Sequence, residues 1–146
     1  MPHTSRTKDF HFDLPDQWID RTMIAWSAPQ SPGRAVAPNV LIAYDTPRNG
    51  ETLAAYVDRQ LRDLMSKAKK FQLDLRRDTE LQGRKAVELL FQWDTGTALL
   101  KQRQIYSLLP DGRTLTLVNT ATSAEFEQIE PQFSAIYNSF GWNEPS

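Results

Sequence analysis

The side chains in this sequence that could carry out chemistry are few and scattered. His11 and Asp13 flank one residue in an alternating segment, a spacing that could place two metal ligands on one strand face. Asp20, Asp45 and Asp94 are expected at strand ends, where two carboxylates could act as general acid and base. Such residues are more often surface and turn residues, so we expect neither a metal site nor a catalytic site.

The composition excludes further classes of site. The 146-residue chain has no cysteine, and therefore no disulfide, cysteine-ligated zinc or cysteine nucleophile. It lacks the sequence motifs of serine hydrolases, phosphate-binding loops and dinucleotide-binding folds. Its 17 basic and 18 acidic residues give a formal charge of −1, which offers no electrostatic reason to expect nucleic acid as a partner. We expect a protein that is not an enzyme and uses no cofactor.

The distribution of apolar residues also bears on location. No run approaches the roughly 18 apolar residues that a membrane-spanning helix needs. Residues 1–12 are polar and lack the apolar segment of a secretory signal. We therefore expect a single domain over residues 1–146 that lies in the cytoplasm and is not inserted in a membrane.

Apolar periodicity predicts three strands, a helix, four strands and a second helix. Hairpin-length turns join the last four strands, so these should be antiparallel. Thr122 and Glu125 match a capping box ahead of the second helix, and Pro131 should kink or split that helix. The fold class is α+β, with a largely antiparallel sheet packed by two long helices. The strands are expected at 9–14, 20–28, 39–45, 71–81, 85–94, 97–109 and 113–122, and the helices at 51–70 and 126–140.

Three glutamines stand where apolar residues are expected. Gln60 falls on the apolar stripe of the first helix with Leu64, and Gln102 and Gln104 share a strand face with Leu100. A buried amide needs hydrogen-bond partners, so these side chains either border the core and reach solvent or line an apolar groove. Such a groove suits an apolar ligand with accessible backbone, such as a hydrophobic helix with exposed glycines.

The order of several short motifs resembles that of the DcrB-like domain family of short bacterial proteins. More narrowly, the chain is similar to the effector-associated (Eag) chaperones of type VI secretion, over about residues 10–140. The motifs are Leu14-Pro-x-x-Trp18-x-Asp20-x-Thr22, Pro38-Asn-Val-Leu-Ile42, Glu51-Thr-Leu53-x-x-Tyr56-Val-x-x-Gln60, Leu81-x-Gly83-Arg-x-Ala86, Gln102-Arg-Gln104 and Leu109-Pro-Asp-Gly112.

The resemblance implies a PsbP-like sandwich that forms a homodimer. It also implies a cytoplasmic chaperone that shields the N-terminal transmembrane helices of type VI effectors, of the Rhs or PAAR type, before they are loaded on the secretion spike. The alternative is a non-catalytic PsbP-like binding or adaptor module with a different protein partner. The positions that match the family's client groove are Gln60, Leu64, Leu100 and Gln102 or Gln104, with Ile24, Trp26, Leu41 and Ala43 as candidates whose face depends on strand register.

Overall fold

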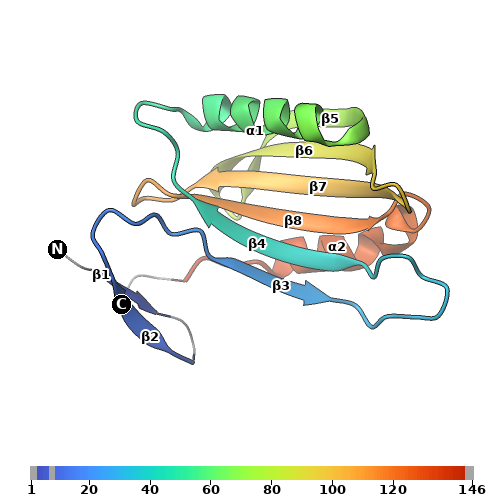
Figure 1. Ribbon diagram of the computed structural model, residues 1–146, viewed down its shortest axis with the longest axis horizontal. Helices are drawn as coiled ribbons and strands as arrows, with labels where there is room; N and C mark the ends of the chain where they lie inside the picture. The colour runs from blue at the N-terminus through green and yellow to red at the C-terminus, as the bar shows by residue number, and fades with distance from the viewer. Residues whose placement is uncertain (1–2, 7–8, 144–146) are drawn as a thin grey trace.

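A six-stranded antiparallel sheet with a helix against each face forms the body of the protein (Figure 1). The computed structural model describes residues 3–6 and 9–143. The strand order in the sheet is β3-β4-β8-β7-β6-β5, so β3 and β5 are its edges. The elements are β1 (His3–Arg6), β2 (His11–Leu14), β3 (Met23–Ser27), β4 (Asn39–Asp45), α1 (Leu53–Lys67), β5 (Lys69–Leu81), β6 (Arg84–Asp94), β7 (Leu99–Leu108), β8 (Thr114–Thr122) and α2 (Phe126–Ser139).

The architecture confirms the predicted α+β class and antiparallel sheet, but the helices are of ordinary length. They contain 15 and 14 residues, close to the average for globular proteins, so the prediction of two long helices is not confirmed. Within the described part of the chain, neither helix is both long and apolar enough to cross a membrane.

The N-terminal strands form a separate hairpin. β2 pairs only with β1 in a two-stranded antiparallel sheet and does not join the main sheet. The prediction was therefore wrong in making residues 9–14 the first strand of one sheet and in assigning no strand before them. A two-stranded ribbon outside the core requires no continuous apolar face, so the polar composition gave no sign of β1.

The α1 helix begins two residues after its predicted start at residue 51 and ends three residues before its predicted end. The hydroxyl of Thr52 accepts a hydrogen bond from the backbone N–H of Ala55 at 3.1 Å and caps the helix. At the other end, Lys69 and Lys70 belong to β5 and not to the helix, which corrects the prediction of a helix to residue 70. Lys70 has a left-handed φ of 53°, so the chain turns sharply, without a loop, from helix into strand.

The α2 helix is continuous through Pro131, so the predicted split does not occur. Pro131 has no N–H to donate to the backbone carbonyl of Glu127. Both residues are exposed, so solvent can reach this part of the helix. Of the predicted capping box, the structure shows the contact of the Thr122 hydroxyl with the backbone of Glu125, but the helix starts at Phe126, and its N-cap residue, Glu125, makes no side-chain cap hydrogen bond. The Thr122 hydroxyl accepts from the backbone N–H of Glu125 at 3.3 Å and lies 3.3 Å from the Glu125 carboxylate.

Alternate residues of the same strands build two separate cores. In β6, Ala86 packs on the α2 side of the sheet, whereas Val87 and Leu89 pack on the α1 side. The α1-side core comprises Tyr56, Val57, Val87, Leu89, Phe91 and Tyr106. The α2-side core comprises Val40, Leu81, Ala86, Ile105, Leu109, Leu115, Leu117, Ala121, Phe126 and Phe133.

A buried ion-pair network ties α2 to the sheet. Glu88, which is 4% exposed, accepts hydrogen bonds from the Nε atoms of Arg77 at 2.9 Å and Arg103 at 2.8 Å. Arg103 also donates through Nη1 to Glu130 of α2 at 2.6 Å. Glu88 and Arg103 each have two partners of opposite charge, and hydrogen bonds to charged groups contribute more to stability than those between neutral groups.

The network predicts a large loss of stability on truncating its buried member. Glu88→Ala should lower the free energy of unfolding by about 2 kcal/mol, because Arg103, in a largely buried position, would lose one of its two carboxylate partners and keep only Glu130. Asp78→Ala on the exposed surface of β5 is the control and should change stability by less than about 0.5 kcal/mol. Urea denaturation followed by circular dichroism measures both, and equal effects would contradict the structural role of Glu88.

Candidate functional site: a groove between α1 and the sheet

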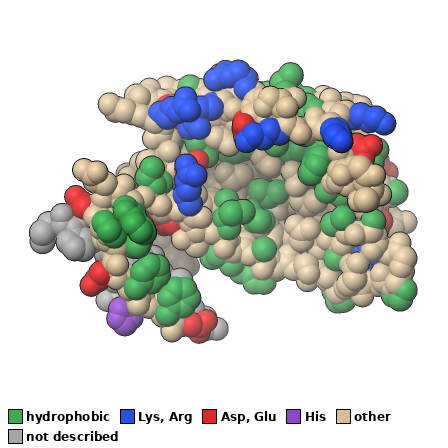
Figure 2. Space-filling view, in the orientation of Figure 1, with side chains coloured by type: hydrophobic (Ala, Val, Ile, Leu, Met, Phe, Trp, Pro, Cys, Tyr) green, Lys and Arg blue, Asp and Glu red, His purple; other side chains and the backbone are tan. Residues whose placement is uncertain are grey.

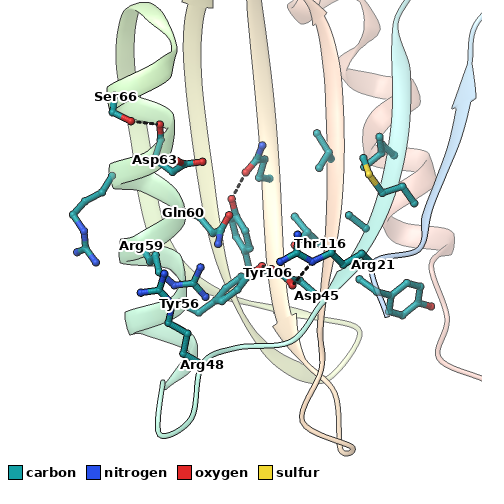
Figure 3. Close-up of a pocket in the computed structure, with 17 residues that line it drawn as sticks. Arg21, Asp45, Arg48, Tyr56, Arg59, Gln60, Asp63, Ser66, Tyr106 and Thr116 are labelled. Carbon is teal, nitrogen blue, oxygen red and sulfur yellow. Dashed lines mark hydrogen bonds and ion pairs between the residues drawn. The ribbon is translucent and has the colours of Figure 1, made fainter. Parts of the chain in front are cut away.

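A groove of about 800 Å³ opens between α1 and the uncovered half of the sheet (Figure 3). It exists because α1 packs over β5, β6 and β7 through the buried side chains of Tyr56 and Val57. On that face, β8, β4 and β3 have no helix above them. We call this space the α1 groove.

The α1 groove has a mainly uncharged floor and a charged rim. The space-filling view shows hydrophobic side chains in a hollow below a row of basic side chains that follows α1 (Figure 2). The floor contains Met23 of β3, Leu41 and Ala43 of β4, Gln104 and Tyr106 of β7, and Thr116 and Val118 of β8. The α1 wall contains Tyr56, Arg59, Gln60, Arg62, Asp63 and Ser66, and the rim is completed by Arg21, Asp45 and Arg48.

A ladder of polar side chains runs along the groove-facing side of β7. The Tyr106 hydroxyl donates to Oε1 of Gln104, whose Nε2 lies 3.4 Å from Oε1 of Gln102. Gln102 in turn donates to the hydroxyl of Thr120 at 2.9 Å. The ladder exists because residues two apart share one strand face. Each carboxamide has a second N–H that these contacts do not use, and that of Gln104 belongs to a side chain that lines the groove.

Gln60 faces this ladder from the opposite side of the groove. It projects from α1 toward the sheet (Figure 3), and its amide has no hydrogen-bond partner among residues 9–143. The structure therefore brings Gln60 and Gln104 to one groove, with Leu41 and Ala43 on the floor between β3 and β8.

Three other predicted positions lie on the same side of the sheet but outside the groove lining. Leu64 packs against the α1-side core, and Leu100 is 7% exposed. Gln102 lies one step beyond Gln104 along β7 and supports its amide. These three residues are next to the groove and do not line it.

Ile24 and Trp26 lie on the opposite face of the sheet. In the antiparallel register of β3 with β4, Ile24 is paired with Ile42 and Trp26 with Val40. Val40 belongs to the α2-side core, so its paired neighbour projects to that side as well. The groove candidate from β3 is instead Met23, which is paired with Ala43.

Ion pairs and hydrogen bonds fix the end of the groove near the start of α1. Arg59 donates to both carboxylate oxygens of Glu51, at 2.9 and 2.8 Å, and these bonds lower the pKa of Glu51 to about 2. The Tyr56 hydroxyl donates to Asp45 at 2.8 Å, and burial raises the pKa of Tyr56 to about 12. Arg21 lies 3.7 Å from Asp45.

The family assignment follows from the whole length of this fold. The model of the DcrB family matches residues 10–139. The chain belongs to the DcrB family. The predicted resemblance is thus confirmed, and the sequence is also 29% identical to Effector EagT6 of Pseudomonas aeruginosa over 128 residues, covering 86% of each chain.

Solved structures with low sequence identity share the fold of this DcrB-family protein. The crystal structure of the Pseudomonas aeruginosa protein PA94, described as of unknown function, has a TM-score of 0.82 and 24% identity, with 99% of each chain covered. LpqN of Mycobacterium tuberculosis has a TM-score of 0.59 and 17% identity, covering 95% of this chain and 82% of LpqN. PsbP of Synechocystis sp. PCC 6803 has a TM-score of 0.56 and 12% identity, covering 98% of this chain and 92% of its own. The expectation of a PsbP-like fold is confirmed.

The carboxylates considered for catalysis each have a structural partner in this DcrB-family protein. Asp20 accepts from Arg113 at 2.7 Å, Asp45 from Tyr56, and Asp94 from the backbone N–H of Gly96 at 2.8 Å. Across residues 3–6 and 9–143, no three His, Asp or Glu side chains are grouped as a metal site would require. The names of the relatives describe no enzymatic activity.

Sequence reasoning missed the aromatic and basic members of the α1 groove. Tyr106 continues the period-two pattern of Gln102 and Gln104, so the strand pattern could have identified it. Arg48 and Arg21 lie in loop segments with no periodicity, and only the fold brings them to the groove.

The Glu51–Arg59 pair predicts an acid-dependent contribution to stability. Because the folded-state pKa of Glu51 is lowered to about 2, its contribution is fully present above the ordinary value near 4.5 and is lost as pH falls toward 2. The stability difference between the wild type and Glu51→Gln should be constant from pH 7 to 5 and shrink below pH 4.5. Urea denaturation between pH 7 and 3 measures it, and a difference that does not depend on pH would contradict the pairing.

Proposed function

We propose that this DcrB-family protein is a chaperone of type VI secretion. It binds the N-terminal transmembrane segments of an effector of the Rhs or PAAR type in the cytoplasm and shields them until the effector is loaded on the spike. The observation that carries this proposal is the α1 groove, with Gln60 and Gln104 on either side of an apolar floor, in a chain 29% identical to Effector EagT6.

The chemistry of the groove suits a hydrophobic helix better than a small polar ligand. Leu41, Ala43 and Val118 offer apolar contact, and burial of apolar surface contributes about 25 cal/mol per Å². A helix rich in small residues brings its backbone carbonyls close to its neighbours, where Gln60 and Gln104 can donate hydrogen bonds. This combination resembles the contacts between helices in a membrane.

The groove of one chain is shorter than a transmembrane helix, so a bound helix would need a second protein surface to cover the rest of it. The groove wall is the 15-residue helix α1, which at 1.5 Å per residue is about 22 Å long, the length of about four helical turns. A transmembrane helix of about 20 residues has more than five turns. One chain therefore shields only part of such a client, which favours cooperation between two copies.

We further propose that the second copy binds at the N-terminal part of the chain. Most of the large exposed hydrophobic side chains lie within residues 10–26, and β3 is an edge strand of the main sheet. An edge strand with exposed apolar side chains readily pairs with another chain. The exposed hydrophobic residues are Phe10, Phe12, Trp18, Ile19, Met23, Ile24 and Trp26.

A charge on the groove floor should abolish client binding. Leu41→Glu should weaken the complex with the N-terminal hydrophobic fragment of a Rhs- or PAAR-type effector by at least about 100-fold, because client binding would bury the new carboxylate. Leu99→Glu is the matched control, since Leu99 is exposed and outside the groove. Co-expression followed by affinity co-purification measures both. Retention of the client by Leu41→Glu would locate the binding surface elsewhere, and no complex with the unaltered chain would refute the chaperone function.

A charge on the exposed surface of β3 should disrupt self-association. Trp26, 56% exposed, is predicted to contact the second copy, so Trp26→Glu should produce a monomer at concentrations where the wild type is a dimer. Met65→Glu on α1 is the control, because Met65 is comparably exposed but lies in another element. Sedimentation velocity distinguishes the two states. A monomeric wild type would refute the homodimer, and a dimeric Trp26→Glu would exclude this surface.

A further inference from the structure

The hydrogen bonds of the polar ladder on β7 all run in one direction. The Tyr106 hydroxyl donates to Oε1 of Gln104, whose Nε2 donates to Oε1 of Gln102. Gln102 in turn donates through Nε2 to the Thr120 hydroxyl. In both carboxamides the oxygen therefore faces the Tyr106 end of the ladder and the nitrogen faces the Thr120 end. Because a carboxamide can exchange its oxygen and nitrogen by half a rotation, the groups at the ends of the ladder must set this direction.

The two hydroxyls at the ends differ in chemistry. A phenol O–H is more acidic than the aliphatic O–H of threonine, so Tyr106 is the stronger donor and Thr120 the stronger acceptor. Tyr106 is only 3% exposed, and in the described part of the chain its hydroxyl makes no hydrogen bond other than the one to Gln104. If the ladder ran the other way, Gln104 would donate to the Tyr106 oxygen, and the phenolic proton would be buried without an acceptor. Burial without a partner is unfavourable, so the observed direction is preferred.

Tyr106 is held in place by the core, whereas Gln104 is not. The Tyr106 ring packs edge-on against Tyr56 in the α1-side core, with ring centroids 6.1 Å apart. Burial also raises the pKa of Tyr106, so its hydroxyl keeps the proton that it donates. Gln104 is only half-buried and lines the α1 groove. Its long side chain has several rotamers, and the hydrogen bond from Tyr106 restricts them.

On the basis of the function proposed above, we propose that Tyr106 is a positioning residue for client recognition: its hydroxyl holds Oε1 of Gln104, so that Gln104 offers its amide N–H, and not its oxygen, to a client. An amide N–H binds hydrogen-bond acceptors, and every helix carries backbone carbonyls. Small residues let another surface approach these carbonyls closely. The groove therefore recognises an accessible helix backbone, and Tyr106 acts on the client only through Gln104.

A double-mutant cycle tests whether Tyr106 acts through Gln104. Tyr106→Phe removes the hydroxyl and keeps the ring, and Gln104→Met removes the carboxamide and keeps a side chain of similar length. The probe is a fluorescent synthetic helix of about 20 Ala, Leu and Gly residues with two serines at each end. Fluorescence anisotropy measures its Kd for each variant. Tyr137→Phe is the matched control, because it removes a hydroxyl that donates to the backbone carbonyl of Glu80, but on α2, at the other face of the sheet.

Tyr106→Phe should raise the Kd of the peptide about 5-fold, as expected for the loss of one hydrogen bond between neutral groups. In the Gln104→Met background the same change should alter the Kd by less than about 2-fold, because no carboxamide is left to orient. Tyr137→Phe should leave the Kd unchanged. Urea denaturation adds a measurement without a client: the double variant should be more stable than Gln104→Met alone, which leaves the phenolic proton without its acceptor.

The outcomes separate the inference from the proposed function. An equal loss of affinity on Tyr106→Phe in both backgrounds would show a role in packing alone and would overturn the inference while leaving helix binding intact. An unchanged Kd for Tyr106→Phe or for Gln104→Met in the otherwise unaltered chain would also overturn it. If the unaltered protein does not bind the peptide, both the proposed function and the inference fail.

Discussion

A sheet of six strands has two broad faces, and this chain has one helix to place against each. With strands about 4.8 Å apart the sheet is roughly 24 Å wide, whereas a helix covers about 10 Å of it. About half of each face therefore has no helix above it. On the α1 side the uncovered half becomes the floor of the groove, and exposed Ile24 and Trp26 lie on the other side, at the edge that β3 forms. The two proposed binding surfaces, the α1 groove and the exposed surface of β3, both lie where no helix covers the sheet.

On the α1 side of the sheet, β7 is the last strand that α1 contacts before the uncovered strands begin. One face of β7 packs in the α2-side core, and its other face lines the groove. Ile105 and Arg103 point to the α2 side, where they pack in the core and join the Glu88 network. Gln104 and Tyr106 point to the α1 side and form the polar ladder of the groove. The strand can combine the two tasks because alternation separates the faces completely. Polar residues in its sequence therefore do not weaken the core that it also builds.

Much of the fold could be predicted from the sequence, because element type depends on local periodicity. The strand at 39–45, the helix near 53–67 and the shared face of Gln102 and Gln104 all follow from it. The face of β3 could not be predicted, since Ile24 and Trp26 acquire a side of the sheet only through pairing with β4. The arginines of the rim were likewise missed, because loops without periodicity bring them together. Local patterns predicted the elements, and pairing between distant segments determined which residues share a site.

The direct passage from α1 into β5 has a mechanical consequence. Only Ala68 separates the last helical residue from the first strand residue, and the Tyr56–Asp45 hydrogen bond ties the start of α1 to β4. Because both ends of α1 are connected to the sheet, the helix is restrained from moving away from the sheet to widen the groove. If the groove binds a helix as proposed, its fixed width would favour helices that present Gly and Ala to the floor over helices that present Phe or Trp. Connectivity of the backbone, and not only the chemistry of the floor, would then set which helices can enter.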